Sequence, residues 1–183
     1  MQSILSAHGV EVVLESDVGL HVDVEETGET FAENAMLKAR AVMEASGLPA
    51  IADDSGVCVD ALNGAPGVYS ARYGGPELDD VARYRLLLEN MRGTRTRTAH
   101  FTSCIACVFP NGDTLEAEGI CPGTIAFAPQ GDGGFGYDPV FFLPELRKTY
   151  AQLTPEEKAA VSHRGKALAV FDVKLREYLK GND

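Results

Sequence analysis

The sequence lacks the features that mark membrane-spanning proteins, secreted proteins and nucleic-acid-binding surfaces. No apolar run approaches the roughly 20 residues that a transmembrane helix needs. Residues 1–5 carry no basic flank before an apolar stretch, so we expect no secretory signal peptide. Lys and Arg number 16 against 27 Asp and Glu, for a net charge of −11. Because nucleic acids are bound mainly by clustered Lys and Arg, we expect a cytoplasmic protein with neither a nucleic acid nor a membrane as partner.

Cysteine is also scarce, with four residues in the chain. Cys104 and Cys107 have the C-x-x-C spacing used by redox and zinc sites. However, they lie in a segment at 98–109 that is typical of a strand, and residues three apart on a strand point to opposite faces. No second C-x-x-C could complete a zinc site. We therefore predict buried thiols in a reducing compartment.

An acidic chain can still bind a single nucleotide, because a divalent cation can bridge carboxylates to a phosphate chain. With 183 residues, of which 45% are hydrophobic, the chain can bury one substantial core. We expect residues 1–183 to form a single domain.

Helix and strand signals alternate along this domain. Thr30 and Glu33 form a capping-box pattern at the start of a helix that Gly47 ends near Ser46. Residues 110–113, Pro-Asn-Gly-Asp, are typical of a hairpin turn. The remaining patterns predict the end of a helix at 1–7, short strands at 50–53 and 57–62, a helix at 78–91, strands at 98–109 and 114–121, and a helix that starts with Pro155. This mixture indicates an α/β fold with a mixed central β-sheet flanked by helices.

Two acidic segments could serve a cation. Asp53-Asp54-Ser55-Gly56 follows an apolar strand, and a carboxylate there can hold Mg²⁺ or take a proton from water. Neighbouring strand residues face opposite ways, so only one of the two aspartates can easily point into a given site. A plain turn is equally compatible with these residue types.

The second acidic segment, Glu25-Glu26-Thr27-Gly28-Glu29, precedes the helix that carries Lys38. A lysine about two turns into that helix could reach a phosphate that shares a cation with the carboxylates. By itself, the segment is more typical of a solvated acidic loop.

A glycine-rich segment at 131–136 matches G-x-G-x-x-G, the dinucleotide-binding pattern. That function requires a helix after the glycines, whereas Tyr137 to Phe142 contains proline and is typical of a strand, so we reject it. The glycines instead allow a ligand to approach the backbone closely, and Phe135 or Tyr137 offers a ring for stacking on a base. A glycine-rich hairpin with aromatic packing is the alternative.

Lys158, His163 and Arg164 form a basic group near the C-terminus. On one continuous helix they would point in widely separated directions, at ~100° per residue. They converge only if the helix breaks near Ser162 and restarts with Ser162 as its N-cap, and we predict that break. Converging donors would suit a carbonyl oxygen on a base, and a patch that neutralises the acidic chain is the alternative.

The ordered set of these motifs resembles the inosine/xanthosine triphosphate pyrophosphatases over nearly the whole chain, from about Glu11 to Lys180. The resemblance implies a two-lobed fold with the nucleotide site in the cleft between the lobes. It also implies Mg²⁺-dependent hydrolysis of ITP, dITP or XTP to the monophosphate and pyrophosphate by a homodimer. Such an enzyme would cleanse the nucleotide pool.

The resemblance also implies roles for particular residues. Glu25 and Asp54 would bind the metal, and Asp54 would be the general base. The residues that contact the substrate would be Lys38, Ser55, Phe135, Gly136, Tyr137, Asp138, Lys158, His163 and Arg164. Within this set Lys38 would hold the phosphates and Phe135 would stack on the base, while Lys158, His163 and Arg164 would recognise it.

One departure concerns the start of the chain. Members of this family open with a strand and a Thr/Ser-x-Asn-x-x-Lys loop that grips the triphosphate, and this sequence begins after it. The departure leaves two hypotheses. The first is an active pyrophosphatase whose true start lies upstream, and the second is a nucleotide-binding or dimerising relative with impaired catalysis. For residues 1–183 alone we expect severely reduced activity.

Overall fold

A computed structural model describes residues 9–181 of the chain. The expected helix end at 1–7 lies outside the described residues. No described helix is both long enough and apolar enough to cross a membrane. The helices are α2 (Phe31–Ser46), α3 (Asp80–Asn90), α4 (Pro155–Val161) and α5 (His163–Gly181), and the strands are β1 (Ala50–Val59), β2 (Thr98–Val108), β3 (Thr114–Ile125), β4 (Phe141–Leu143) and β5 (Lys148–Thr149). Short 3-10 turns occupy Glu15–Val18, Asp60–Leu62, Gly67–Arg72 and Tyr150–Gln152.

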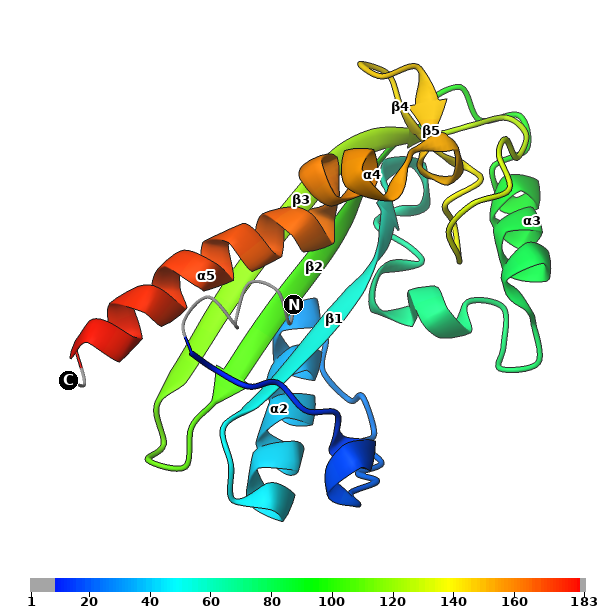
Figure 1. The fold of residues 1–183 in the computed structure, drawn as a ribbon. Coiled ribbons are helices and arrows are strands. Elements are labelled where there is room, and N and C mark those ends of the chain that lie inside the picture. The colour runs from blue at the N-terminus through cyan, green and yellow to red at the C-terminus, as the bar shows by residue number, and fades with distance from the viewer. Residues whose placement is uncertain (1–8, 182–183) are drawn as a thin grey trace. The chain divides into compact units, whose positions relative to one another are not determined.

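The five strands form one sheet in the order β1-β2-β3-β4-β5. The hairpin turn predicted at 110–113 joins β2 to β3, and the Phe109 N–H donates to Asp113 O at 2.9 Å across it. The pairs β3–β4 and β4–β5 are antiparallel, with Phe142 opposite Thr124 on one side and Thr149 on the other. The expected α/β class, a β-sheet flanked by helices, is confirmed. The expectation of a mixed sheet is wrong, because the strands are antiparallel (Figure 1).

The chain divides into two compact units, here called the first unit and the second unit. The first unit comprises Met1–Asp54, Ser103–Gly119 and Arg164–Asp183, and the second comprises Ser55–Thr102 and Ile120–His163. Each unit therefore combines segments that are far apart in the sequence. The location of a nucleotide site relative to the two units stays a prediction.

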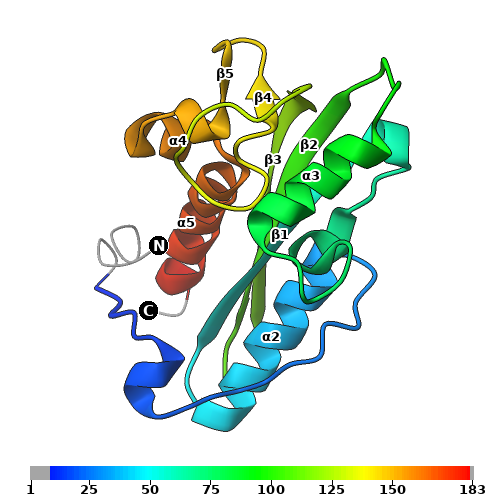
Figure 2. The same cartoon turned by 90° about the vertical axis from the view of Figure 1, so that its right-hand side faces the viewer.

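In the first unit, α2 and α5 cover opposite faces of the strands (Figures 1 and 2). Ala167, Phe171 and Leu175, on one stripe of α5, pack against Ile105 and Cys107 of β2. Helix α2 begins as predicted, because Thr30 accepts a hydrogen bond from the Glu33 N–H in a complete capping box. Its buried stripe is Phe31, Ala35 and Ala39.

In the second unit, α3 packs on the sheet through Tyr84, Leu87 and Met91 (Figure 2). Aromatic rings form much of the same core. The ring centroids of Phe101 and Phe141 are 4.7 Å apart, edge to face. Tyr137 and Val140, which lie between the glycine-rich segment and β4, belong to this core.

Two sequence expectations about local structure had opposite outcomes. The expected interruption at Asp54-Ser55-Gly56 is wrong, because β1 is a single strand from Ala50 to Val59. Pairing with β2 satisfies this backbone and outweighs the turn preference of Asp, Ser and Gly. By contrast, the break near Ser162 is confirmed, since α4 ends at Val161 and Ser162 has the extended backbone (φ −70°, ψ 157°) that N-cap residues adopt.

The cysteines are free thiols, three of them buried, as predicted. Cys107 packs against α5, whereas the Cys104 thiol donates to Glu118 Oε2 at 3.6 Å. Burial raises the pKa of both thiols to about 12. Since the thiolate is the reactive form, these residues are structural.

Candidate active site

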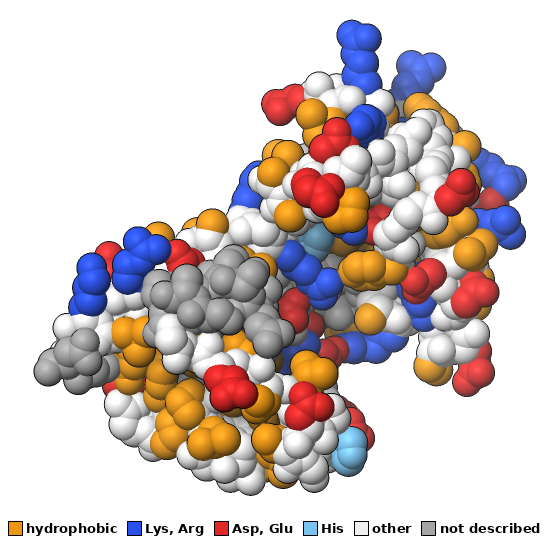
Figure 3. Space-filling model, in the orientation of Figure 1, with side chains coloured by type: hydrophobic (Ala, Val, Ile, Leu, Met, Phe, Trp, Pro, Cys, Tyr) orange, Lys and Arg blue, Asp and Glu red, His pale blue; other side chains and the backbone are white. Residues whose placement is uncertain are grey.

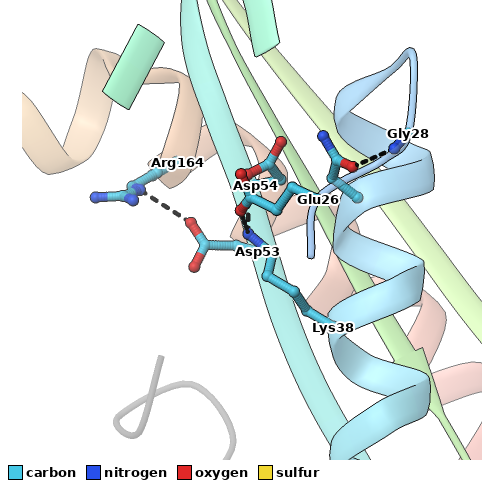
Figure 4. A network of polar contacts seen from close by, with 7 residues as sticks. Glu26, Gly28, Lys38, Asp53, Asp54 and Arg164 are labelled. Carbon is cyan, nitrogen blue, oxygen red and sulfur yellow. Dashed lines mark hydrogen bonds and ion pairs between the residues drawn. The ribbon is translucent and has the colours of Figure 1, made fainter. Parts of the chain in front are cut away.

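Lys38 lies at the centre of a charged group in the first unit (Figure 4). Its ammonium Nζ donates to Asp54 Oδ1 at 2.8 Å and to Glu26 Oε1 at 3.0 Å. Lys38 comes from α2, Asp54 from β1 and Glu26 from the loop before α2. Three segments of the chain thus place two carboxylates in contact with the ammonium group of Lys38.

The loop that carries Glu26 is held by a close contact with α2. The Gly28 N–H donates to Asn34 Oδ1 at 2.8 Å (Figure 4), and Asn34 is fully buried. A Cβ on residue 28 would lie 2.6 Å from that same oxygen, so the position accepts only glycine without rearrangement. Asn34 therefore sets the path of the loop that brings Glu26 to Lys38.

One oxygen and one nitrogen at this place are left unsatisfied. Asp54 Oδ2 and Asn34 Nδ2 are both buried, and neither has a hydrogen-bond partner among the described residues. Asn34 nevertheless lies near enough to Asp54 to lower its pKa. Because buried polar atoms are normally paired, this spot suits a cation, a water molecule or a substrate oxygen.

The local environment shifts the pKa of both central groups. Burial raises the pKa of Asp54 above its ordinary value, and Lys38 only partly offsets this effect, while the negative charge of Glu26 adds to it. Burial alone would lower the pKa of Lys38, but its hydrogen bonds to Asp54 and Glu26 raise it. A carboxylate with a raised pKa is suited to accept a proton.

Asp53 points away from this group, as the alternation of a strand requires. Its Oδ2 accepts from Arg164 Nε at 3.1 Å, so Asp53 anchors the first turn of α5 (Figure 4). The prediction that only one aspartate faces a given site is confirmed.

The carboxylate oxygens of Asp54 and Glu26 are of the type that binds a divalent cation. No group of three or more His, Cys, Asp or Glu within residues 9–181 is arranged to hold a metal by itself. However, Asp54 and Glu26 already share a cationic group, and Asp54 keeps a buried oxygen with no partner. Carboxylate oxygens are the ligands that Mg²⁺ prefers, and Mg²⁺ usually completes its shell with water and substrate phosphates.

In the second unit, Asp138 and Lys158 form an ion pair beside an exposed ring. Lys158 Nζ contacts Asp138 Oδ2, and it lies 4.9 Å from the centroid of the Phe135 ring. Asp138 is buried and also accepts from the Phe135 N–H at 2.9 Å, whereas Phe135 itself is 62% exposed. The arrangement presents an aromatic face and an ammonium group together.

Glycine is required where the chain turns around Asp138. Gly134 has φ +76°, and a Cβ there would lie 1.9 Å from Asp138 Oδ2. The turn ends in the strand Phe141–Leu143, and residues 137–140 contain no helix. The rejection of a dinucleotide-binding motif is therefore confirmed.

Two of the predicted substrate residues are packed into the second unit. Tyr137 is buried and its hydroxyl donates to Ser70 O at 2.8 Å. His163 is buried as well, with its ring stacked on Phe101 at 4.5 Å between centroids. Both side chains support the fold around Phe135 and Lys158.

Known proteins resemble this chain along nearly its whole length. The family model described as the Ham1 family matches residues 1–173. This chain belongs to the Ham1 family. Among its relatives, the dITP/XTP pyrophosphatase of Exiguobacterium sp. is 47% identical over 181 residues, which cover 99% of this chain and 92% of that protein. The dITP/XTP pyrophosphatase of Haemophilus influenzae is 50% identical over 179 residues, or 96% of this chain and 91% of that one.

Solved structures of Ham1 proteins show the same fold. The Coxiella burnetii HAM1 protein matches with a TM-score of 0.91 at 42% identity, over 96% of this chain and 91% of that one. The Staphylococcus aureus Ham1 protein matches with a TM-score of 0.86 at 39% identity, over 100% and 96% of the two chains.

The structure brings together some of the predicted site residues of this Ham1 chain. It joins Lys38 to Asp54 in one unit and Phe135, Asp138 and Lys158 in the other. Gly136 donates its N–H to Asp80 Oδ2 at 2.8 Å, at the edge of the same turn. The convergence of Arg164 with Lys158 and His163 stays a prediction. The contacts of these three residues with a substrate, and that of half-buried Ser55, also stay predictions.

Three residues of this region were not among the site residues expected from the sequence: Glu26, Asn34 and Asp53. Glu25, the implied metal ligand, is exposed, and no side-chain contact joins it to Lys38 or Asp54 within the described part of the chain. The spacing of Asn34 and Lys38, four residues apart on one face of α2, was the available signal for Asn34. The sequence carries no signal to separate Glu25 from Glu26.

Proposed function

We propose that this Ham1 protein hydrolyses the non-standard purine nucleotides ITP, dITP and XTP to the monophosphate and pyrophosphate, and so cleanses the nucleotide pool. The observation that carries the proposal is the unpaired, buried oxygen of Asp54 beside Lys38 and Glu26. The names of the close relatives, dITP/XTP pyrophosphatases, support the substrate class and favour an active hydrolase over an impaired relative.

Hydrolysis needs a water molecule to lose a proton as its oxygen attacks phosphorus. Asp54 accepts that proton, and burial raises its pKa toward the range where this transfer is efficient. The anhydride bond between the α- and β-phosphates breaks, and pyrophosphate leaves with the bonding electrons. Lys38 then holds the charge of the phosphate chain.

Mg²⁺ is the proposed cofactor, with Asp54 as one ligand and Glu26, or its neighbour Glu25, as the second. When bound, it would neutralise phosphate charge and make the attacking water more acidic. Lys38 Nζ bridges the two carboxylates and neutralises part of their charge. Phosphate oxygens would draw this ammonium away from the carboxylates, so the nucleotide and the cation should assist each other's binding.

The adjacent glutamates offer a matched test of the metal site. We expect Glu26→Gln to weaken Mn²⁺ binding about tenfold or more, because it removes a partly buried carboxylate beside Asp54. Glu25→Gln, which removes the same charge from an exposed position, should change Mn²⁺ affinity little. Calorimetric titration with Mn²⁺ measures both, and the reverse ranking would assign the second ligand to Glu25.

Base selection rests on Phe135 and Lys158. A purine stacks on the exposed ring, and the 6-keto oxygen of inosine accepts a hydrogen bond from Lys158, which Asp138 holds in place. The 6-amino group of adenosine cannot accept this bond, and a desolvated donor without an acceptor costs about 1–3 kcal/mol or more. Arg164, held by Asp53, is a further proposed donor to the base.

We further propose that the protein acts as a homodimer in the cytoplasm. Acidic and basic side chains are interspersed on the face shown in Figure 3, which supports a small-molecule substrate over a nucleic acid. The decisive experiment is a panel of nucleoside triphosphates with Mg²⁺, assayed for pyrophosphate release. We expect ITP, dITP and XTP to exceed ATP and GTP by about two orders of magnitude, and equal rates would refute the proposed specificity.

A further inference from the structure

A cluster of arginines surrounds a cavity in the second unit that is lined by none of the candidate active-site residues. We call it the arginine pocket, and its volume is about 550 Å³. Its charged and aromatic lining consists of Arg85, Glu89, Arg92, Arg95, Arg97 and Phe127. Four guanidinium groups thus face one carboxylate, in a chain whose net charge is −11.

Two of the four arginines have structural partners. Arg97 donates from Nε to Ile125 O at 2.6 Å and from Nη2 to Ala126 O at 2.8 Å, which joins the start of β2 to the end of β3. Arg92 pairs with Glu89. Glu89, the one carboxylate of the pocket lining, is therefore paired with Arg92, and Arg97 is held in place by its hydrogen bonds to Ile125 and Ala126.

The other two arginines have no such partner. Arg85 and Arg95 are exposed, and neither side chain forms an ion pair or a hydrogen bond with the rest of residues 9–181. Guanidinium groups are suited to bind phosphate oxygens in pairs of parallel hydrogen bonds. An anion in the pocket would also relieve the repulsion among the four positive charges.

The remaining feature is an aromatic ring that the fold does not bury. Phe127 is 80% exposed, more than any other large hydrophobic side chain described. The Arg97 guanidinium lies over it, 4.4 Å from the ring centroid. Because its hydrogen bonds fix Arg97, this pair forms a rigid platform on which a flat base can stack.

From these features we propose that the arginine pocket is a second nucleotide site, which binds the phosphate chain of a nucleotide through Arg85 and Arg95 and stacks its base on Phe127. The volume is within the 300–1,000 Å³ typical of small-molecule sites. The lining offers no neutral polar side chain for reading a base edge apart from Thr94, so the site should accept ordinary nucleotides such as ATP. This inference does not depend on the proposed hydrolysis.

The test is a titration of the protein with ATP in magnesium-free buffer, followed by amide chemical shifts. We expect shifts at residues 85–97 and around 127, saturating in the micromolar to millimolar range. The double variant Arg85→Gln/Arg95→Gln should weaken ATP binding at least about tenfold, since it removes both charge-assisted contacts. The charge-matched control Arg40→Gln/Arg147→Gln, which removes two exposed arginines elsewhere, should not.

Inorganic triphosphate separates a nucleotide site from a simple phosphate site. Phe127→Ala should weaken ATP binding about tenfold while it leaves triphosphate binding unchanged, because only the base stacks on the ring. Phe127 is exposed, so the variant should fold normally, which a thermal melt checks. Failure of ATP to shift these residues, equal losses in the control double variant, or no effect of Phe127→Ala on ATP would each overturn the proposal.

Discussion

The candidate site residues of the two units differ in type: those of the first unit are mainly charged, and those of the second combine an aromatic ring with an ion pair. In the first unit, two carboxylates converge on Lys38 beside a buried oxygen with no partner, so charge is concentrated there and left partly uncompensated. In the second, the buried Asp138 carboxylate is paired with Lys158, and the neighbouring Phe135 ring is exposed. The first arrangement suits phosphates and a cation, and the second suits a base.

Both arrangements need a glycine, and the steric reason is the same in the two units. Gly28 lets the acidic loop approach Asn34, and so brings the Glu26 carboxylate to the ammonium group of Lys38. Gly134 makes room for the Asp138 carboxylate that holds Lys158. In each case the glycine removes a Cβ so that a buried polar side chain can reach its partner.

The largest expected effect is in the first unit. Asp54→Asn keeps the shape of the side chain but removes the base and one carboxylate ligand, so pyrophosphate release from ITP should fall about a thousandfold or more. Binding of the product IMP, which depends on the second unit, should change little. Coupled-enzyme assays and calorimetry measure the two quantities, and retained turnover would place the base elsewhere.

The next effect belongs to the second unit. Lys158→Met should lower the ratio of kcat/KM for ITP to that for ATP about tenfold or more, because the donor to the keto oxygen is lost. It also leaves the buried Asp138 carboxylate without its ion-pair partner, which costs about 3 kcal/mol of stability. Lys148→Met, at the exposed pair with Glu157, is the matched control and should leave the ratio unchanged.

A third change uses metal affinity to test the charge balance of the first unit. Lys38→Met removes the ammonium that bridges Glu26 and Asp54, so Mn²⁺ should bind about tenfold more tightly in the absence of nucleotide. The same variant should raise the KM for ITP, since a phosphate contact is lost. An unchanged or weaker Mn²⁺ affinity would show that Lys38 does not compete with the cation.

The smallest expected effect concerns the contribution of the exposed ion pair between Lys148 and Glu157 to the stability of the second unit. The ion pair with Lys148 lowers the pKa of Glu157, so its stabilising effect is present above the ordinary glutamate value of about 4.3 and is lost as the pH falls through the lowered value. The difference in Tm between the wild type and Glu157→Gln should therefore be small at pH 7 and vanish near pH 3. A difference that persists in acid would indicate a cause other than charge.

Local signals predicted most of the helices and the hairpin. Thr30 and Thr154 each accept a hydrogen bond from the backbone N–H three residues ahead, within the first turn of α2 and α4. The Pro-Asn-Gly-Asp turn closes between adjacent strands. The predicted interruption of β1 was wrong because strand formation depends on the neighbouring strand. Pairing with β2 holds Asp54-Ser55-Gly56 extended against its local preference for a turn.

The sequence by itself determined the family of this protein, the classes of residue in its site and the break at Ser162, because each depends on an ordered set of motifs or on contacts within a few residues. Only the tertiary structure decided which carboxylates meet Lys38 and what holds Arg164. Glu26 faces Lys38 because Asn34 fixes the loop, and Asp53 meets Arg164 across 111 positions of sequence. Side-chain direction in a loop, and contacts between distant segments, depend on packing that no local pattern encodes.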